Sequence, residues 1–195
     1  MMVMEKEFLK SKENAIESLR KAKIDDKVDR KILSILDLIN NSGEFYTSSS
    51  CAGRIVLLQI PGIGDKRNAK FVGIWHRTIK SKEILSALKE AKSGLLWILA
   101  QPPIIHISAK SRAAADKLVK IANASGFKNS AFKSDNNNIV VEICSTERLD
   151  APIGEDGILF CNKDYLNLLV KIANEVILKS NLKLKRFESE LKEKL

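Results

Sequence analysis

The sequence predicts an α+β fold in which helices pack on a mostly antiparallel sheet, not a doubly wound parallel sheet of the Rossmann type. Two helical segments open the chain, and one long helical segment closes it. Between them, β-rich segments come mainly in pairs joined by turn sequences, and helices stand between the pairs. The recurrence of a strand pair and a helix suggests an internal duplication, although no repeat is visible residue by residue.

A pair of helices is expected over residues 5–41. The first spans residues 5–22. The second begins at Val28-Asp29, and the turn sequence Asn40-Asn41-Ser42-Gly43 ends it. The apolar residues expected to face inward recur at helical spacing: Phe8, Ala15 and Leu19 in the first helix, and Ile32, Ile35, Leu36 and Ile39 in the second.

An α+β core is expected over residues 44–161, followed by a long helix over residues 163–193, all within one domain of residues 1–195. Alternating or β-branched runs bounded by turn residues indicate the strands of this core. The expected strands are residues 54–60, 70–76, 95–100, 104–108, 128–133, 138–144 and 158–161.

Two shorter helices are expected inside the core, over residues 82–92 and 111–125. Gly126 follows the second of them, where a glycine commonly ends a helix in the left-handed conformation. Asn162 stands where the last helix begins and is expected to cap it. Asp135-Asn136-Asn137 is expected to form the turn of a hairpin.

The segment Pro61-Gly62-Ile63-Gly64 has the small residues of a helix-hairpin-helix turn, but its flanks do not fit that module. Residues 54–58 and 71–75 are β-branched and aromatic, which favours a glycine-bearing loop between two strands. The two glycines also lack the third glycine and the following helix of a dinucleotide-binding loop.

The composition is that of a globular protein, with 45% hydrophobic and 29% charged residues among 195. The longest apolar stretch, residues 95–100, is far shorter than a membrane-spanning helix. The first 20 residues carry Lys and Glu throughout, so we do not expect a signal peptide. Three widely spaced cysteines and two histidines argue against a disulfide framework and a structural metal site, and they favour a reducing, cytoplasmic location.

The net charge of +9 is concentrated in the middle of the chain: residues 32–133 carry 15 basic and 6 acidic side chains. A local excess of this kind is typical of a surface that binds a polyanion such as RNA, although a general bias toward solubility gives the same total. The candidate contacts to RNA are Lys66, Arg67, Lys70, Lys128, Asn129 and Ser130.

The polar segment Thr47–Arg54 is the first candidate for a site. It contains three serines, Cys51, Gly53 and Arg54. One interpretation is a serine-rich loop with a tight bend at Gly53. The other is a binding site in which hydroxyls, a close backbone approach and a guanidinium hold an anionic group. We assign cofactor binding to Ser48, Ser49, Gly53 and Arg54, and catalysis to Ser50 and Cys51.

His76 and His106 complete the catalytic candidates. Each ends or lies within an expected strand, where most histidines are simply packed and hydrogen-bonded. They are nevertheless the two imidazoles of the chain, and imidazole is the side chain best suited to act as a general base near neutral pH.

The order of short motifs along nearly the whole chain resembles the tRNA wybutosine-synthesising protein 3 family, in a stand-alone, archaeal-like form. The central match is Ser49-Ser50-Cys51-Ala52-Gly53-Arg54-Ile55. The other matching segments are Val28-Asp29, Leu36–Asn40, Trp75-His76, Ile105-His106-Ile107, Gly126–Ser130, Ser145–Pro152 and Asp164–Glu175. Three positions depart from the family pattern: Ala52, Ala131 and Cys144, and the last puts in doubt a role carried by an arginine there.

The resemblance implies an S-adenosylmethionine-dependent methyltransferase. Its substrate would be the aminocarboxypropyl-demethylwyosine base next to the anticodon of tRNA-Phe, methylated at the ring nitrogen N-4. Two other classes stay open on the residues alone. One is a non-catalytic RNA-binding protein, and the other is a cysteine hydrolase that uses Cys51 with His76 or His106.

Overall fold

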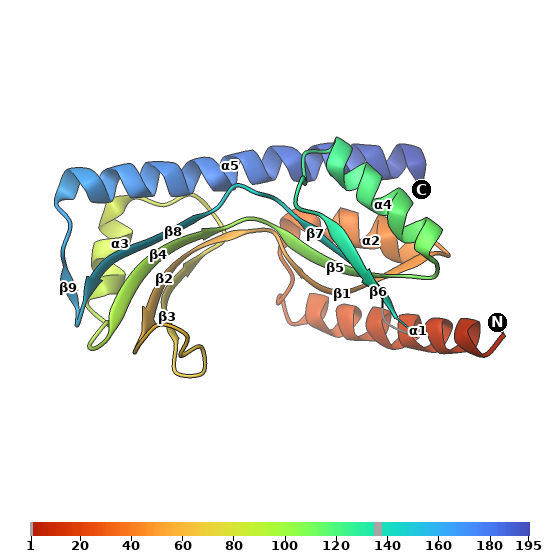
Figure 1. Ribbon diagram of the computed structural model, residues 1–195, viewed down its shortest axis with the longest axis horizontal. Helices are drawn as coiled ribbons and strands as arrows, with labels where there is room; N and C mark the ends of the chain where they lie inside the picture. Colours follow the sequence, from red (N-terminus) through yellow and green to blue (C-terminus); the bar gives the residue numbers. More distant parts are fainter. Residues whose placement is uncertain (1, 135–137) are drawn as a thin grey trace. The chain divides into compact units, whose positions relative to one another are not determined.

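The computed structural model of the protein describes residues 2–134 and 138–195, so the expected turn at Asp135-Asn136-Asn137 lies outside the described residues. Its helices are α1 (Met2–Ile24), the short 3₁₀ helix η1 (Arg30–Ile32), α2 (Leu33–Asn41), α3 (Ser81–Leu88), α4 (Arg112–Ala124) and α5 (Lys163–Lys194) (Figure 1). Its strands are β1 (Phe45–Cys51), β2 (Arg54–Ile60), β3 (Lys70–Trp75), β4 (Leu95–Gln101), β5 (Ile104–Ala109), β6 (Ala131–Ser134), β7 (Ile139–Cys144), β8 (Leu149–Glu155) and β9 (Ile158–Leu159). Within the described residues, no helix combines the length and apolar character needed to cross a bilayer.

The α+β prediction is confirmed, but the strands form two antiparallel sheets instead of one. The first sheet has the strand order β1-β5-β7-β6, and the second has the order β3-β2-β4-β8-β9. The chain correspondingly divides into two compact units. The first unit comprises Met1–Ala52, Pro103–Thr146 and Ser180–Leu195, and the second comprises Gly53–Pro102 and Glu147–Lys179. The expectation of one domain over residues 1–195 and the suggested duplication both stay predictions.

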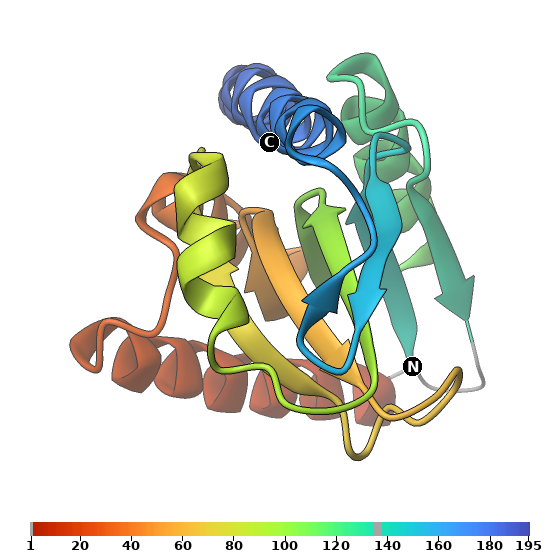
Figure 2. The same cartoon turned by 90° about the vertical axis from the view of Figure 1, so that its left-hand side faces the viewer.

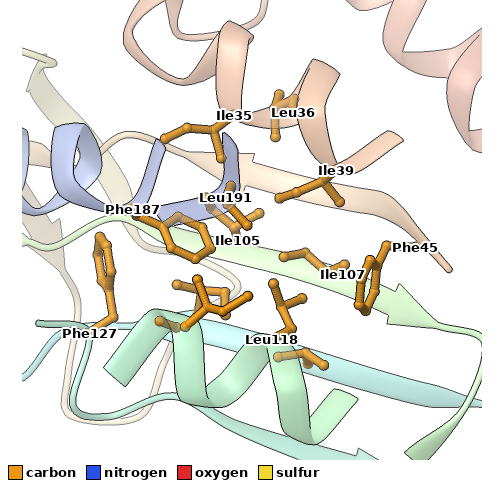
Figure 3. Packing of buried hydrophobic residues seen from close by; sticks show 14 of the residues in the cluster. Ile35, Leu36, Ile39, Phe45, Ile105, Ile107, Leu118, Phe127, Phe187 and Leu191 are labelled. Carbon is orange, nitrogen blue, oxygen red and sulfur yellow. The ribbon is translucent and has the colours of Figure 1, made fainter. Parts of the chain in front are cut away.

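The core of the first unit lies on one face of its sheet, under α2, α4 and the last turns of α5. Figure 3 shows side chains from these three helices meeting side chains of β5. Ile35 of α2, Leu118 of α4 and Phe187 of α5 are fully buried against Ile105 and Ile107 of β5. Alternate residues of β5 point into this core, which leaves the residues between them for the opposite face of the sheet.

The end of α4 confirms the role expected for Gly126. This glycine has φ = +101°, in the left-handed region that residues with a Cβ rarely adopt. Its N–H donates to the carbonyl of Asn123 at 3.1 Å, and the N–H of Phe127 donates to the carbonyl of Ala122 at 2.9 Å. These two bonds are those of a Schellman motif, and they place Phe127 in the core.

The second unit packs α3 and the first part of α5 on one face of its five-stranded sheet (Figure 2). Ile84 of α3 and Ala173 of α5 are fully buried against Ile55, Leu57 and Ile98 of the central strands. The expected loop between β2 and β3 is confirmed, because these strands pair antiparallel. Asn162 also caps α5 as expected, accepting a hydrogen bond from the N–H of Tyr165 at 2.9 Å.

Two expectations about the second unit were wrong in detail. The helix expected over residues 82–92 spans only Ser81–Leu88. Strand β8 was not expected, because it contains Pro152, which cannot donate to a neighbouring strand. Pro152 lies opposite Trp97 of β4, next to a shift in the pairing register between Leu96 and Trp97.

Candidate active site

The serine segment is not a loop but strand β1, at the edge of the first unit's sheet, and an irregularity in that strand decides where its serines point. Phe45 pairs with Ala109, and Thr47 pairs with Ile107, on the core face. The register then shifts between Thr47 and Ser49, so Ser48 is an extra residue. Because side chains alternate along a strand, this single extra residue moves Ser49 from the core face to the opposite face.

On that opposite face, three polar side chains from adjacent strands form a hydrogen-bonded line. Ser49 of β1 lies opposite His106 of β5, which lies opposite Glu142 of β7. The Ser49 Oγ is 2.8 Å from Nδ1 of His106, and Nε2 of His106 is 3.1 Å from Oε2 of Glu142. The side chain of His106 is 33% exposed, and that of Glu142 is 44% exposed. The sheet therefore joins a hydroxyl, an imidazole and a carboxylate, in that order.

A cavity of about 420 Å³ lies beside β1 in the same unit. Thr47–Ser50 line one side of it, and α1 lines the other with residues that include Asn14 and Ser18. Because β1 is an edge strand, peptide groups on its outer side have no neighbouring strand to pair with. Hydroxyls of β1 and the amide of Asn14 therefore share the lining with apolar side chains such as Leu19 and Val28, which suits the cavity to a small ligand with polar and apolar parts.

Several contacts hold α1 as the far wall of this cavity. The rings of Phe8 and Tyr46 lie 5.2 Å apart between centroids. The Nζ of Lys12 donates to the carbonyl of Ser42, and burial lowers the pKa of Lys12 below its ordinary value. The Nζ of Lys110 lies 2.6 Å from Oε1 of Glu5, and this ammonium lowers the pKa of Glu5.

Two residues that were not expected to be functional hold the chain near the start of β1 and just after its end. Asn40, at the end of α2, makes two hydrogen bonds with Thr47. A carboxylate oxygen of Asp29 accepts a hydrogen bond from the N–H of Ala52 at 2.7 Å. Both residues lie in segments that resemble the family, Val28-Asp29 and Leu36–Asn40. That resemblance is the sequence signal that could have indicated their importance. Together they set the strand that carries the serines.

Gly53 and Arg54 belong to the second unit, and both have specific surroundings there. Gly53 has φ = +92°, which explains a glycine at this bend. The Nε of Arg54 donates to Oε1 of Gln101 at 2.7 Å, and its guanidinium carbon lies 5.2 Å from the centre of the Phe71 ring. With the residues that the structure describes, its terminal nitrogens form no hydrogen bond. A guanidinium positioned in this way can still donate twice to an anionic group.

The remaining candidates of the second unit lie at the surface around β3. His76 follows the end of β3 and is exposed. Lys66 and Arg67 are exposed in the loop between β2 and β3, and Lys70 begins β3. The three cations are therefore exposed, and their contact with RNA stays a prediction.

The segment Lys128-Asn129-Ser130 of the first unit has a structural role that the sequence did not suggest. The N–H of Asn129 donates to the carbonyl of Cys144 at 3.2 Å, and the N–H of Cys144 donates to Oγ of Ser130 at 3.2 Å. The hydroxyl of Ser130 is therefore engaged with β7, whereas the side chains of Lys128 and Asn129 are exposed.

The candidates thus fall into two groups. The first unit brings Ser48, Ser49, Ser50 and Cys51 of β1 together with His106 of β5. The second unit contains Gly53, Arg54, His76 and the three cations of the β2–β3 region. The sequence alone does not indicate Glu142, because its place beside His106 depends on strand pairing and not on neighbouring residues.

A protein-family comparison decides the class of this protein. The sequence model of the family described as "Methyltransferase TYW3" matches residues 10–193, nearly the whole chain. The chain belongs to this family. The resemblance seen in the sequence is therefore confirmed, and the chain is a methyltransferase, a kind of transferase. The family does not favour the alternatives of a non-catalytic RNA-binding protein or a cysteine hydrolase.

Curated relatives from archaea cover the chain almost completely. A protein of Pyrococcus horikoshii is 44% identical over 185 residues, 94% of each chain, and is named "tRNA(Phe) 7-((3-amino-3-carboxypropyl)-4-demethylwyosine(37)-N(4))-methyltransferase 1". A protein of Thermococcus sibiricus with the same name, without the final number, is 42% identical and covers 98% of each chain.

Solved structures share the fold. The PH1069 protein from Pyrococcus horikoshii superposes with a TM-score of 0.91 at 43% identity and covers 96% of this chain and 97% of its own. A hypothetical protein from Aeropyrum pernix superposes with a TM-score of 0.72 at 27% identity, covering 86% of this chain and 99% of its own.

Proposed function

We propose that this chain transfers a methyl group from S-adenosylmethionine to N-4 of the aminocarboxypropyl-demethylwyosine base at position 37, next to the anticodon of tRNA-Phe. The observation that carries the proposal is the 44% identity with a relative named for this reaction, over 94% of both chains. A cytoplasmic location, where tRNA is found, is part of the same proposal.

The cavity beside β1 fits the polar end of this cofactor. A carboxylate and an ammonium need hydrogen-bond donors and acceptors together, and the hydroxyls of Ser48 and Ser50 supply both. When bound, S-adenosylmethionine supplies an electrophilic methyl group on a sulfonium sulfur. The role of the chain is then to align that methyl group with the ring nitrogen, and alignment alone can contribute ~7–11 kcal/mol to catalysis.

The basic residues of the second unit fit the other partner. Lys66, Arg67 and Lys70 are exposed on and beside the β2–β3 loop. Contacts between such cations and phosphates supply most of the sequence-independent affinity for nucleic acid. Arg54, with its terminal nitrogens available and its guanidinium against Phe71, is suited to hold an anionic group of either the cofactor or the tRNA.

Calorimetry of the purified protein with S-adenosylmethionine tests this function directly. The proposal predicts saturable binding with one cofactor per chain, and tighter binding of tRNA-Phe that carries the demethylwyosine-type base than of unmodified tRNA-Phe. A protein that binds RNA without catalysis would bind both tRNAs and give no heat with the cofactor, and that outcome would overturn the proposal.

A further inference from the structure

We propose that Ser49, His106 and Glu142 form a proton relay that removes the proton from the ring nitrogen as it is methylated. The inference rests on the proposed function and names the group that completes it. The relay is built on three neighbouring strands of one sheet, β1, β5 and β7, and all three residues lie within the first unit. Contacts of 2.8 and 3.1 Å join them in series.

The carboxylate at one end sets the direction of both hydrogen bonds. An ionised Glu142 can only accept a hydrogen bond, so Nε2 of His106 carries the hydrogen that lies between them. A neutral imidazole with its hydrogen on Nε2 has a lone pair on Nδ1. Nδ1 therefore accepts from the hydroxyl of Ser49. The two lone pairs of the Ser49 oxygen are left to accept a hydrogen bond from a ligand.

The position of Ser49 connects this line to the cavity. Ser49 lines the cavity beside β1 and, of the three residues, is the one placed to touch a ligand there. The register shift between Thr47 and Ser49 is what turns its side chain toward His106. Bulges of this kind often re-aim a side chain next to an active site. Ser49 is thus the catalytic member, and His106 and Glu142 act through it.

Methylation of a ring nitrogen that carries hydrogen requires that a proton leave. As the nitrogen forms its bond to the methyl carbon, the bond from that carbon to the sulfonium sulfur breaks, and its electron pair stays on the sulfur as a neutral thioether. The proton of the ring nitrogen passes to Oγ of Ser49, and the hydroxyl proton of Ser49 passes to Nδ1 of His106. The resulting imidazolium is stabilised by the carboxylate of Glu142.

The partial exposure of His106 and Glu142 allows the transferred proton to leave for solvent. His106 is 33% exposed and Glu142 is 44% exposed, so the proton on the imidazolium has a path to bulk water after each turnover. No oxidant, reductant or further reactant is needed. The same contacts could instead serve only to pair three strands, and that alternative differs in what a substitution changes. Loss of a purely structural contact alters stability, whereas loss of the relay alters the pH dependence of the chemical step.

Nitrogen NMR of the imidazoles gives a readout that is independent of activity. The chain has two histidines, so the variant His76→Gln leaves the ring of His106 as the single imidazole signal. We expect the neutral ring to carry its hydrogen mainly on Nε2. In the double variant His76→Gln/Glu142→Gln, the amide can donate as well as accept, and a larger share of the ring should carry its hydrogen on Nδ1. A ring that carries its hydrogen mainly on Nδ1 while Glu142 is present would overturn the relay.

Single-turnover methyl transfer to tRNA-Phe tests the chemical role. For the wild type, we expect the rate to fall at acid pH, as in reactions that depend on a general base. His106→Gln should lower the rate about 100-fold and abolish this acid dependence, in the range typical of a general base. Glu142→Gln should lower the rate about 10-fold with little change in cofactor binding. Glu190→Gln, which removes a carboxylate paired with Lys194 in the same unit, is the matched control and should behave as the wild type.

The outcomes separate the two proposals. Normal transfer by the wild type together with normal transfer and an unchanged acid dependence in His106→Gln would overturn the relay alone. A folded wild type that binds tRNA-Phe but transfers no methyl group would overturn the proposed function, and the relay with it.

Discussion

The side-chain amide of Asn40 forms hydrogen bonds with both the backbone and the side chain of Thr47. Its Nδ2 donates to Oγ1 of Thr47 at 2.8 Å, and its Oδ1 accepts from the N–H of Thr47 at 2.9 Å. Both residues are buried, with 8% and 6% of their surface exposed. The pair fixes the end of α2 against β1 one residue before the register shift, and so sets the start of the serine segment.

Replacement of Asn40 by alanine should therefore destabilise the first unit and disturb the site together. The N–H of Thr47 would be left buried without its partner, which costs about 1–3 kcal/mol. Urea unfolding of Asn40→Ala should show this loss. Asn41→Ala, at an exposed neighbouring position of the same helix, serves as the control and should unfold near the wild-type midpoint. Equal stability of the two variants would contradict the role given to the pair.

Substitution of Arg54 by lysine should weaken the binding of an anionic ligand. Lysine keeps the charge but loses the planar fork and the stacking on Phe71, so binding of the cofactor or of tRNA should weaken by about 1.5–3 kcal/mol. Calorimetry with each ligand measures the change. Arg148→Lys, at an exposed arginine of the same unit that pairs with Asp150, is the control. If Arg54→Lys binds both ligands as the wild type does, Arg54 is not part of the site.

The affinity for tRNA should depend steeply on salt, through the cations of the β2–β3 region. The triple variant Lys66→Gln/Arg67→Gln/Lys70→Gln should flatten the plot of log affinity against log salt, because each lost phosphate contact removes about one unit of slope. A triple variant of exposed cations on α5, Lys179→Gln/Lys185→Gln/Arg186→Gln, removes the same charge. A larger effect from the α5 variant would place the tRNA elsewhere.

Substitution of Cys51 distinguishes direct methyl transfer from covalent catalysis. In direct transfer no protein atom becomes attached to the methyl group, so Cys51→Ser should lose no more than about 1–2 kcal/mol of transition-state stabilisation. Ser49→Ala and Ser50→Ala should cost at least as much, because Ser49→Ala removes the hydroxyl that contacts His106, and a hydrogen bond from Ser50 to a charged group contributes about 1.5–3 kcal/mol. Single-turnover rates of methyl transfer by the three folded variants distinguish the two mechanisms. A nearly inactive Cys51→Ser that still binds both ligands would indicate a nucleophilic thiolate.

Acid should weaken the second unit partly through Glu83. Its carboxylate accepts from Arg77 at 2.7 Å and from the N–H of Lys80 at 2.9 Å, and these bonds lower the pKa of Glu83 below its ordinary 4.5. A lowered folded-state pKa gives stability that is present above the unfolded value and is lost as the pH falls through the folded value. Thermal unfolding should therefore show a smaller acid-induced loss for Glu83→Gln than for the wild type. Glu90→Gln, at an exposed neighbouring position, should retain the wild-type acid response.

Local signals in the sequence predicted the parts of the fold that depend on a few neighbouring residues. The glycine after α4 and the asparagine before α5 were assigned correctly, because helix ends need specific conformations and acceptors. The hairpin loop between β2 and β3 follows from β-branched flanks and turn residues in the same way. Strand β8 was missed because Pro152 argues against a strand unless the pairing is already known.

In the candidate site, too, the residue types could be predicted from the sequence, but their arrangement could not. The serine segment and His106 could be selected by residue type, and both lie within the residues that the family model matches. The arrangement of these residues could not be predicted from their neighbours in the sequence. It depends on one extra residue in β1 and on the register by which β7 brings Glu142 to His106, and both are set by contacts between strands far apart in sequence.

The most direct test of the proposed reaction is mass spectrometry of nucleoside 37 after one turnover. Wild-type protein would be mixed with S-adenosylmethionine and with tRNA-Phe that carries the aminocarboxypropyl-demethylwyosine base, and the nucleosides would then be analysed by fragmentation. We expect one added methyl group on N-4 of that base and none on tRNA-Phe that lacks it. An unchanged nucleoside 37 in the presence of bound cofactor and tRNA, or a methyl group on another atom, would contradict the proposed reaction.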